Sequence, residues 1–304
     1  MSALTSSRSA SAEAPRSHVG GRAAADLIGP DFIGIGAARS GTSWIYEVLS
    51  RHSAVWLPPI KELHYFDDPS RKRYYRLLRM RLVSGLWINR PLSLWDFHYF
   101  FGRPSDAWYC RLFEPGRRRG LLTGEITPGY SVLDEKAIAR MRALNPRVKL
   151  IFIMRDPILR CWSAVLKERQ SRGQQGLPND EEAISTARTN GIWSRSIYDK
   201  CIDKLERVFG ADQIFYGFFE ELCDDPKPFV TRLLTFLGVD AGDVNHLSLP
   251  APLNTAAAGR RPPPAFERAL AASLLPSVQE LCDRFDGPPH KWRSRYRALL
   301  GARL

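Results

Sequence analysis

A loop between residues 36 and 43 carries residue types that bind a phosphate group. It reads GAARSGTS, and its glycines, Gly36 and Gly41, have the spacing of a GxxxxGK[ST] phosphate-binding loop. The lysine of that pattern is missing, because Thr42 stands in its place, and Arg39 supplies a fixed positive charge instead. The missing lysine argues against an ATP site with bound magnesium, but not against a phosphate that needs no metal. An ordinary turn between a strand and a helix is the alternative.

A second pair of candidates follows the most apolar segment of the chain, VKLIFIMRDP. Arg155 lies where that segment ends, and Ser163 follows eight residues later, about two turns into the next expected helix. The carboxyl end of a strand is where α/β sheets bind their ligands, so the pair can hold a second, separate phosphate. The alternative is a structural ion pair between Arg155 and Asp156 or a neighbouring residue.

Both candidate sites need strands and helices that position them. Short apolar runs that alternate with helical patterns predict an α/β fold, here a single-domain, P-loop-like three-layer sandwich with a central, mostly parallel sheet flanked by helices. The nearly unbroken apolar run at 148–154 is typical of a strand buried on both faces. We expect strands at 31–38, 54–59, 121–128, 148–157 and 213–219, and helices at 42–52, 134–146, 158–170, 196–209 and 228–238, with a further helix around Leu270, Leu274, Leu275 and Leu281.

The chain divides into a tail and one domain. Residues 1–30 are rich in Ala, Ser, Gly and Arg, which predicts a disordered N-terminal tail, with an organellar targeting peptide as the alternative. Residues 31–304 form the domain.

The five cysteines are scattered without a CxxC pair, so we expect no disulfide framework or zinc site and a cytoplasmic location. No run of about 18 apolar residues predicts a transmembrane segment.

The net charge of +12 is concentrated in one stretch. Residues 69–119 carry 12 Lys or Arg against 3 Asp or Glu, together with 11 of the 33 aromatic residues. Such a stretch attracts nucleic acid, a membrane surface or an acidic small molecule. The alternative is that the arginines cover the outside of helices whose aromatic residues pack inward. We interpret 69–119 as a variable helical and loop insertion on the acceptor side of the domain.

Four segments in this order resemble the sulfotransferase family that uses 3′-phosphoadenosine 5′-phosphosulfate (PAPS), especially its bacterial and heparan-sulfate-type branch. They read GAARSGTS, KELHYFDD, GEITPGY and RDPILRCWS, and the resemblance extends from about residue 31 to residue 250. It implies an enzyme that moves a sulfuryl group from PAPS to a hydroxyl or amine of a small-molecule, carbohydrate or lipid acceptor by in-line displacement, with no metal. It also fits the missing lysine, because family members carry Lys or Arg at the position of Arg39.

The resemblance assigns residues to the donor. The 5′-phosphosulfate loop corresponds to Arg39, Ser40, Gly41, Thr42 and Ser43. Arg155 and Ser163 correspond to the pair that holds the 3′-phosphate. Tyr198 stands where relatives place a tyrosine near the donor, with a core tyrosine as the alternative. Arg260, with Arg261, stands where relatives carry a basic loop over the nucleotide, with a solvated loop as the alternative.

The resemblance also assigns the residues that drive transfer. Glu62 corresponds to the acid that takes the proton of the acceptor, and His64 is its rival, because an imidazole titrates in the useful range. Lys61 can steady the sulfuryl oxygens, and Arg39 can stabilise charge on the bridging oxygen. Ile126 stands where heparan-sulfate-type relatives often carry a lysine. Either Lys61 or Arg39 compensates for it, or the acceptor chemistry differs.

Two other classes of function compete with this interpretation. A P-loop kinase or NTPase shares the expected architecture, but the lysine is absent and no acidic magnesium ligand follows a strand. A nucleic-acid-binding protein is suggested by the basic stretch at 69–119, but the chain has no helix-turn-helix, zinc-finger or RRM pattern, so we expect no specific nucleic-acid partner.

Overall fold

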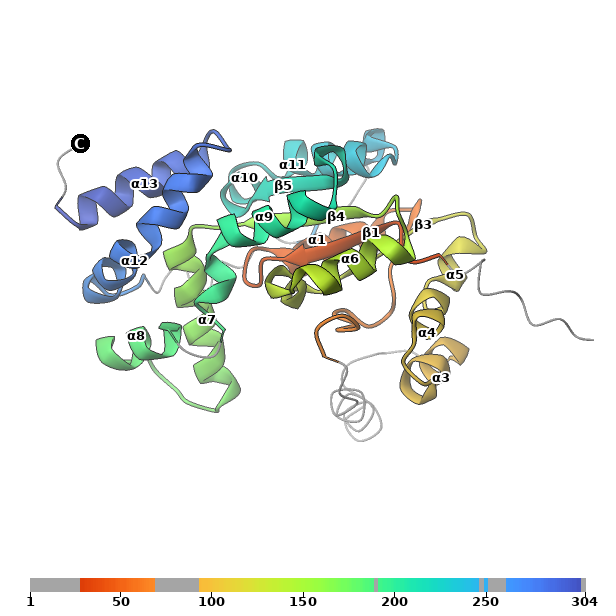
Figure 1. Cartoon of the computed structure of the whole chain (residues 1–304), viewed down its shortest axis with the longest axis horizontal. Helices are drawn as coiled ribbons and strands as arrows, with labels where there is room; N and C mark the ends of the chain where they lie inside the picture. The colour runs from red at the N-terminus through yellow and green to blue at the C-terminus, as the bar shows by residue number, and fades with distance from the viewer. Residues whose placement is uncertain (1–27, 69–92, 189–190, 246–248, 251–260, 302–304) are drawn as a thin grey trace, which may run out of the picture.

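The computed structural model of the chain describes residues 28–68, 93–188, 191–245, 249–250 and 261–301 (Figure 1). Nearly all of the expected tail at 1–30 therefore lies outside the described residues, and so does Arg260. A single domain over 31–304 stays a prediction.

The centre of the molecule is a five-stranded parallel sheet. Its strand order is β2-β3-β1-β4-β5, and every neighbouring pair is parallel. Helices lie on both sides of it (Figure 1), which confirms the three-layer α/β fold predicted from the sequence. The strands are β1 (Phe32–Gly36), β2 (Val55–Trp56), β3 (Leu122–Ile126), β4 (Lys149–Met154) and β5 (Ile214–Phe218).

The predicted helices are present near their predicted bounds. They are α1 (Thr42–Arg51), α6 (Glu135–Leu144), α7 (Pro157–Ser171), α9 (Tyr198–Val208), α11 (Pro226–Leu237) and α12 (Pro264–Cys282). The sequence patterns missed α8 (Asp180–Arg188), α10 (Phe219–Asp224) and α13 (Pro288–Leu299). Among the described residues no helix is both long enough and apolar enough to cross a membrane.

Alternate residues of the strands face the two helical layers. On β4, Leu150 and Phe152 pack in one buried cluster with residues of α6, α7, α9, α12 and α13, while Ile151 and Ile153 pack in another with residues of α1 and α11. Both faces of the strand are thus apolar, as its continuous run of hydrophobic residues indicated.

The described part of the basic, aromatic stretch forms three short helices, α3 (Leu94–Phe101), α4 (Asp106–Arg111) and α5 (Glu114–Arg117). Their aromatic side chains form a third buried cluster, which includes Leu63 and Tyr65 from the loop that follows β2. The Tyr65 and Tyr109 rings stack with centroids 4.5 Å apart. For residues 93–119, the structure therefore favours the alternative in which the aromatic residues pack inward. The same cluster supports the loop after β2.

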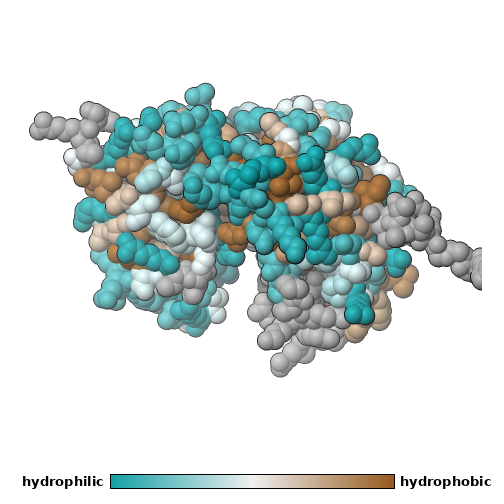
Figure 2. All heavy atoms as spheres, viewed as in Figure 1, coloured by the Kyte–Doolittle hydropathy of each residue, from teal (hydrophilic) through white to brown (hydrophobic). Residues whose placement is uncertain are grey.

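The loops that carry Arg39, Glu62 and Arg155 leave the same edge of the sheet. Because the strands are parallel, the segments after β1, β2, β3 and β4 all begin at the carboxyl edge, where α/β folds bind ligands. Figure 2 shows a notch in the lower edge of the molecule, on the side where α7 descends from the sheet in Figure 1.

Candidate active site

The loop after β1 turns sharply into α1. Arg39 and Gly41 both have positive φ, 72° and 80°. A Cβ on Gly41 would lie 3.0 Å from Leu222, so a side chain here would be both strained and crowded. Ser40 is fully buried, and its hydroxyl has no hydrogen-bond partner among the described residues. Ser43 is exposed on the first turn of α1, whose free N–H groups favour an anion.

The two predicted phosphate-binding groups touch each other. Arg39 Nε donates a hydrogen bond to Ser163 Oγ at 3.0 Å, and Arg155 Nη1 donates to the carbonyl oxygen of Arg39 at 3.0 Å. Ser163 is therefore bonded to Arg39 and not to Arg155, the residue with which it was paired in the sequence. The loop after β1 and the start of α7 form one continuous surface.

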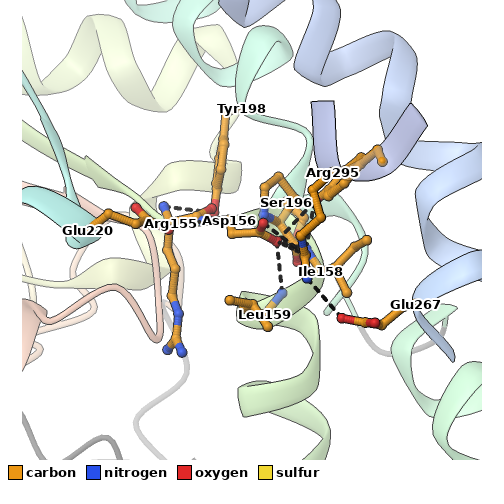
Figure 3. Close-up of polar contacts among 11 residues, drawn as sticks. Arg155, Asp156, Ile158, Leu159, Ser196, Tyr198, Glu220, Glu267 and Arg295 are labelled. Carbon is orange, nitrogen blue, oxygen red and sulfur yellow. Dashed lines mark hydrogen bonds and ion pairs between the residues drawn. The ribbon is translucent and has the colours of Figure 1, made fainter. Parts of the chain in front are cut away.

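Arg155 makes no ion pair with Asp156. The Asp156 carboxylate caps α7 by accepting from the N–H groups of Ile158 and Leu159, and it pairs with Arg295 at 2.9 Å. Figure 3 shows the Arg155 side chain pointing away from Asp156 and Glu220. The alternative of an ion pair between Arg155 and Asp156 is therefore wrong. The Arg155 guanidinium instead contacts the carbonyl oxygen of Arg39.

Tyr198 acts on the site through the backbone of Arg155. Its hydroxyl donates to the Arg155 carbonyl at 2.9 Å and accepts from the Arg155 N–H at 3.4 Å. The ring is buried in the main core cluster. Tyr198 is thus a core tyrosine that fixes the end of β4.

Three arginines gather here, and none of them forms an ion pair with a described carboxylate. They are Arg39, Arg155 and the fully buried Arg160. Burial, followed by the charges of Arg155 and Arg160, lowers the pKa of Arg39. Burial also lowers the pKa of Arg155, against the opposing charges of Glu220 and Asp156, and its buried Nε has no hydrogen-bond partner among the described residues. Mutually repelling cations with free donors are suited to binding an anion.

The titratable residues after β2 form a connected cluster. Lys61 Nζ lies 2.9 Å from Glu62 Oε1, and His64 Nε2 lies 3.3 Å from Glu62 Oε2. The other ring nitrogen, His64 Nδ1, lies 2.8 Å from Asp67 Oδ2. Each nitrogen of the imidazole therefore faces a carboxylate, and this arrangement favours a ring that donates from both.

These contacts determine the charge of Glu62. Burial alone would raise its pKa, but hydrogen bonds from His64 and Lys61 and their charges outweigh burial and lower the pKa to about 2. Glu62 is therefore ionised throughout the neutral range. Its backbone has φ 65°, and that of His64 has φ 54°; with Arg39 they are the non-glycine residues of the described chain with positive φ. Strained backbone of this kind gathers at functional sites.

The turn after β3 supports this cluster through residues that sequence reasoning missed. A Cβ on Gly129 would lie 2.3 Å from Asp67 Oδ2 and 3.3 Å from His64 Cε1, so only glycine leaves room for the His64–Asp67 pair. The HxxD spacing of His64 and Asp67 was visible in the sequence. The contact with Gly129 spans some 60 residues, and no local pattern indicates it.

A buried carboxylate lies beneath the same loop. Glu125 accepts hydrogen bonds from the hydroxyls of Tyr109, Thr127 and Tyr130, and Tyr130 accepts from the backbone N–H of Tyr65 at 2.8 Å. Burial raises the pKa of Glu125 to about 7. Through Tyr130, this network fixes the loop that carries Glu62.

Ile126 contributes no polar group to the site. It is buried, and its side chain packs over Gly34 on the neighbouring strand. Among the described residues, no group of three or more His, Cys, Asp or Glu side chains is placed to hold a metal ion.

The chain is similar to known sulfotransferases. It is 34% identical over 151 residues to human heparan sulfate glucosamine 3-O-sulfotransferase 3B1, covering 46% of this chain and 38% of that protein. It is 31% identical over 205 residues to human heparan sulfate glucosamine 3-O-sulfotransferase 6, covering 62% of this chain and 59% of that protein. The chain thus spans less than two thirds of the length of these relatives.

Solved structures support the fold. A sulfotransferase from Alicyclobacillus acidocaldarius superposes with a TM-score of 0.59 at 23% identity, covering 87% of this chain and 98% of that one. Residues 30–243, more than two thirds of the chain and all of the candidate residues except Arg260 and Arg261, match the profile of the sulfotransferase family. The arginine surface and the Glu62 cluster lie within this region, and the chain belongs to the sulfotransferase family.

Proposed function

We propose that this protein moves a sulfuryl group from PAPS to a hydroxyl group of a carbohydrate. One observation carries the proposal. Arg39, Arg155 and Arg160 meet without acidic partners among the described residues, at the sheet edge that also carries the Glu62 cluster. A bound anion relieves the repulsion among such cations, and a nucleotide with phosphates at two positions fits a surface with several arginines.

The arginine surface would hold the donor. Arg155 and Ser163 are proposed to bind the 3′-phosphate, and residues 39–43 the 5′-phosphosulfate. The buried, unpaired atoms Ser40 Oγ and Arg155 Nε suit this role, because each needs an acceptor that the described residues do not supply. Tyr198 would keep Arg155 in place through its backbone.

The donor supplies a sulfuryl group whose bond to the 5′-phosphate oxygen breaks, leaving its electron pair on that oxygen, while the acceptor oxygen bonds to sulfur. Negative charge grows on the leaving oxygen. Arg39 and the N-terminal turn of α1 are proposed to stabilise that charge. Their positions are fixed before reaction by the Arg39–Ser163 hydrogen bond.

Glu62 is proposed to take the proton that the acceptor hydroxyl loses. Its low pKa makes it a weak base, but a hydroxyl oxygen that is bonding to sulfur becomes strongly acidic, so a weak base suffices. His64, held between Glu62 and Asp67, would orient the carboxylate, and Lys61 would steady the sulfuryl oxygens.

The carbohydrate acceptor is supported by the relatives, several of which are named heparan sulfate glucosamine 3-O-sulfotransferases. A small-molecule or lipid hydroxyl is the other outcome of an acceptor screen. The arginines supply the positive charge around the donor, so we propose that transfer needs no metal ion, and EDTA should leave turnover unchanged.

Calorimetry with adenosine 3′,5′-bisphosphate, the desulfated donor, tests the proposal. We expect it to bind roughly 10-fold or more tightly than AMP, because charged hydrogen bonds to the 3′-phosphate add to affinity. Arg155→Ala should remove most of this difference. Arg188→Ala is the matched control, because Arg188 is exposed at the end of α8. Equal affinities of the wild-type protein for the two nucleotides would sink the proposal.

A further inference from the structure

A short 3₁₀ turn, η3 (Ser194–Ser196), lies between the arginine surface and the Glu62 cluster. On one side, Arg160 Nε donates to Ser196 Oγ, and Arg160 also donates to the carbonyl of Ile192. On the other side, η3 packs on η2 (Pro128–Val132), the turn that carries Gly129. Because Gly129 lies against Asp67, η3 is close to both halves of the site.

The middle residue of this turn, Arg195, has an incomplete set of partners. Its side chain is half-buried. Among the described residues, its buried Nε has no hydrogen-bond partner and no carboxylate forms an ion pair with it. Burial lowers the pKa of Arg195; the charge of Arg160 acts in the same direction, and those of Asp67 and Glu62 oppose it. The guanidinium thus lies within electrostatic reach of the phosphate-binding arginines and of the proposed base.

We propose that Arg195 is a further catalytic residue, which contacts the oxygens of the sulfuryl group while that group passes from donor to acceptor. The proposal rests on the function proposed above. In transfer, one S–O bond to the leaving phosphate breaks and one bond from the acceptor oxygen forms, so the sulfur must pass between the arginine surface and Glu62. The other sulfuryl oxygens stay negative throughout, and Arg195 offers them a planar set of N–H donors.

Two other cations near the site, Lys61 and Arg39, already contact other side chains. Lys61 contacts Glu62 at 2.9 Å, and Arg39 contacts Ser163 at 3.0 Å. Ile126 is buried and apolar. Arg195 therefore adds a second cation beside Lys61 for the sulfuryl oxygens, because its buried Nε has no hydrogen-bond partner among the described residues.

The test compares two nucleotides that differ only by the sulfuryl group. Calorimetry with adenosine 3′,5′-bisphosphate and with PAPS is run on wild type, Arg195→Gln and Arg195→Lys, with Arg188→Gln as the matched control. For Arg195→Gln we expect the affinity for the bisphosphate to stay within about two-fold and that for PAPS to fall roughly 10-fold, the usual effect of losing a charged hydrogen bond. Arg195→Lys should lie between, and it carries the comparison if Arg195→Gln does not fold.

A second readout is the release of labelled sulfate from PAPS to water, which needs no identified acceptor. Arg195→Gln should slow it by roughly 10²-fold, as expected for one preorganised donor, while Arg188→Gln leaves it unchanged. An equal loss of affinity for both nucleotides would place Arg195 in the phosphate site and overturn the proposal. So would unchanged PAPS affinity together with unchanged release. Wild-type protein that binds neither nucleotide would instead refute the proposed function itself.

Discussion

Arg39 and Ser163 are 124 residues apart in the chain, yet Arg39 Nε donates a hydrogen bond to Ser163 Oγ at 3.0 Å. The bond connects the loop after β1 to the second turn of α7, across two neighbouring strands of the sheet. Sequence motifs assign the two residues to different phosphates of the donor. Their contact makes the two assigned regions one surface, so a change at either residue should affect the whole donor site.

Ser163→Ala removes the acceptor that fixes the Arg39 side chain. We expect the affinity for adenosine 3′,5′-bisphosphate to fall roughly 10-fold, because a hydrogen bond to a charged group is lost together with a direct donor to phosphate. Calorimetry measures the change. Ser171→Ala, at the exposed end of the same helix, is the control. If both variants bind like the wild type, Ser163 has no part in the donor site.

Glu62→Gln tests the proposed base. Gln cannot take a proton, so we expect sulfate release from PAPS to fall by roughly 10² to 10⁴-fold, while the affinity for the bisphosphate is retained. Because the pKa of Glu62 is lowered to about 2, wild-type turnover should show no acid limb from this residue between about pH 4 and pH 7.

Two results would assign the proposed base to a residue other than Glu62. If Glu62→Gln keeps its turnover and His64→Gln loses it, the base is His64. An acid limb near neutral pH that persists in Glu62→Gln would also point to another titrating group.

The fold was largely predictable because its local patterns agree with its tertiary structure. The run Leu150–Met154 is apolar at every position, and the strand it forms is buried on both faces. The helix α8 was missed because only Ala183 and Ala187 on it are buried, which leaves too few large apolar residues to reveal a helical period.

The site was predictable only where a motif is contiguous. Arg39 and Arg155 were found from their places after strands, and the family gives the sulfotransferase assignment without support for the kinase or nucleic-acid-binding alternatives. The contacts of these residues were not predicted. Ser163, which the sequence paired with Arg155, bonds to Arg39, and Arg195 lies on a turn that has no sequence motif; both features depend on contacts between distant segments.

Two carboxyl groups with raised pKa values predict how stability depends on pH. Burial raises the pKa of Glu125 and of Glu220 to about 7, from an ordinary value near 4.5. A raised folded-state pKa gives stability that is complete below the unfolded value and is lost as pH rises through the folded value. The free energy of unfolding should therefore fall between about pH 4.5 and pH 7, by on the order of 3 kcal/mol for each group.

Urea unfolding at several pH values measures this loss. Glu125→Gln and Glu220→Gln should each flatten part of the decrease, and the double variant should flatten most of it. Glu47→Gln, on the exposed face of α1, is the control and should leave the slope unchanged. A wild-type stability that is constant from pH 5 to pH 8 would contradict the prediction.

Asp156 predicts a stability effect separate from chemistry. Its carboxylate caps α7, accepts from the Tyr296 hydroxyl and pairs with Arg295, so it connects the end of β4 to α13. Asp156→Ala removes the cap of α7 and one of the two carboxylate partners of Arg295, which keeps Glu267 at 2.8 Å, and should lower the free energy of unfolding by roughly 2 to 4 kcal/mol. Asp225→Ala, which removes only a helix cap at an exposed site, should cost about 1 kcal/mol. Equal losses in urea unfolding would mean that Asp156 acts as a cap and that its pairing with Arg295 adds nothing.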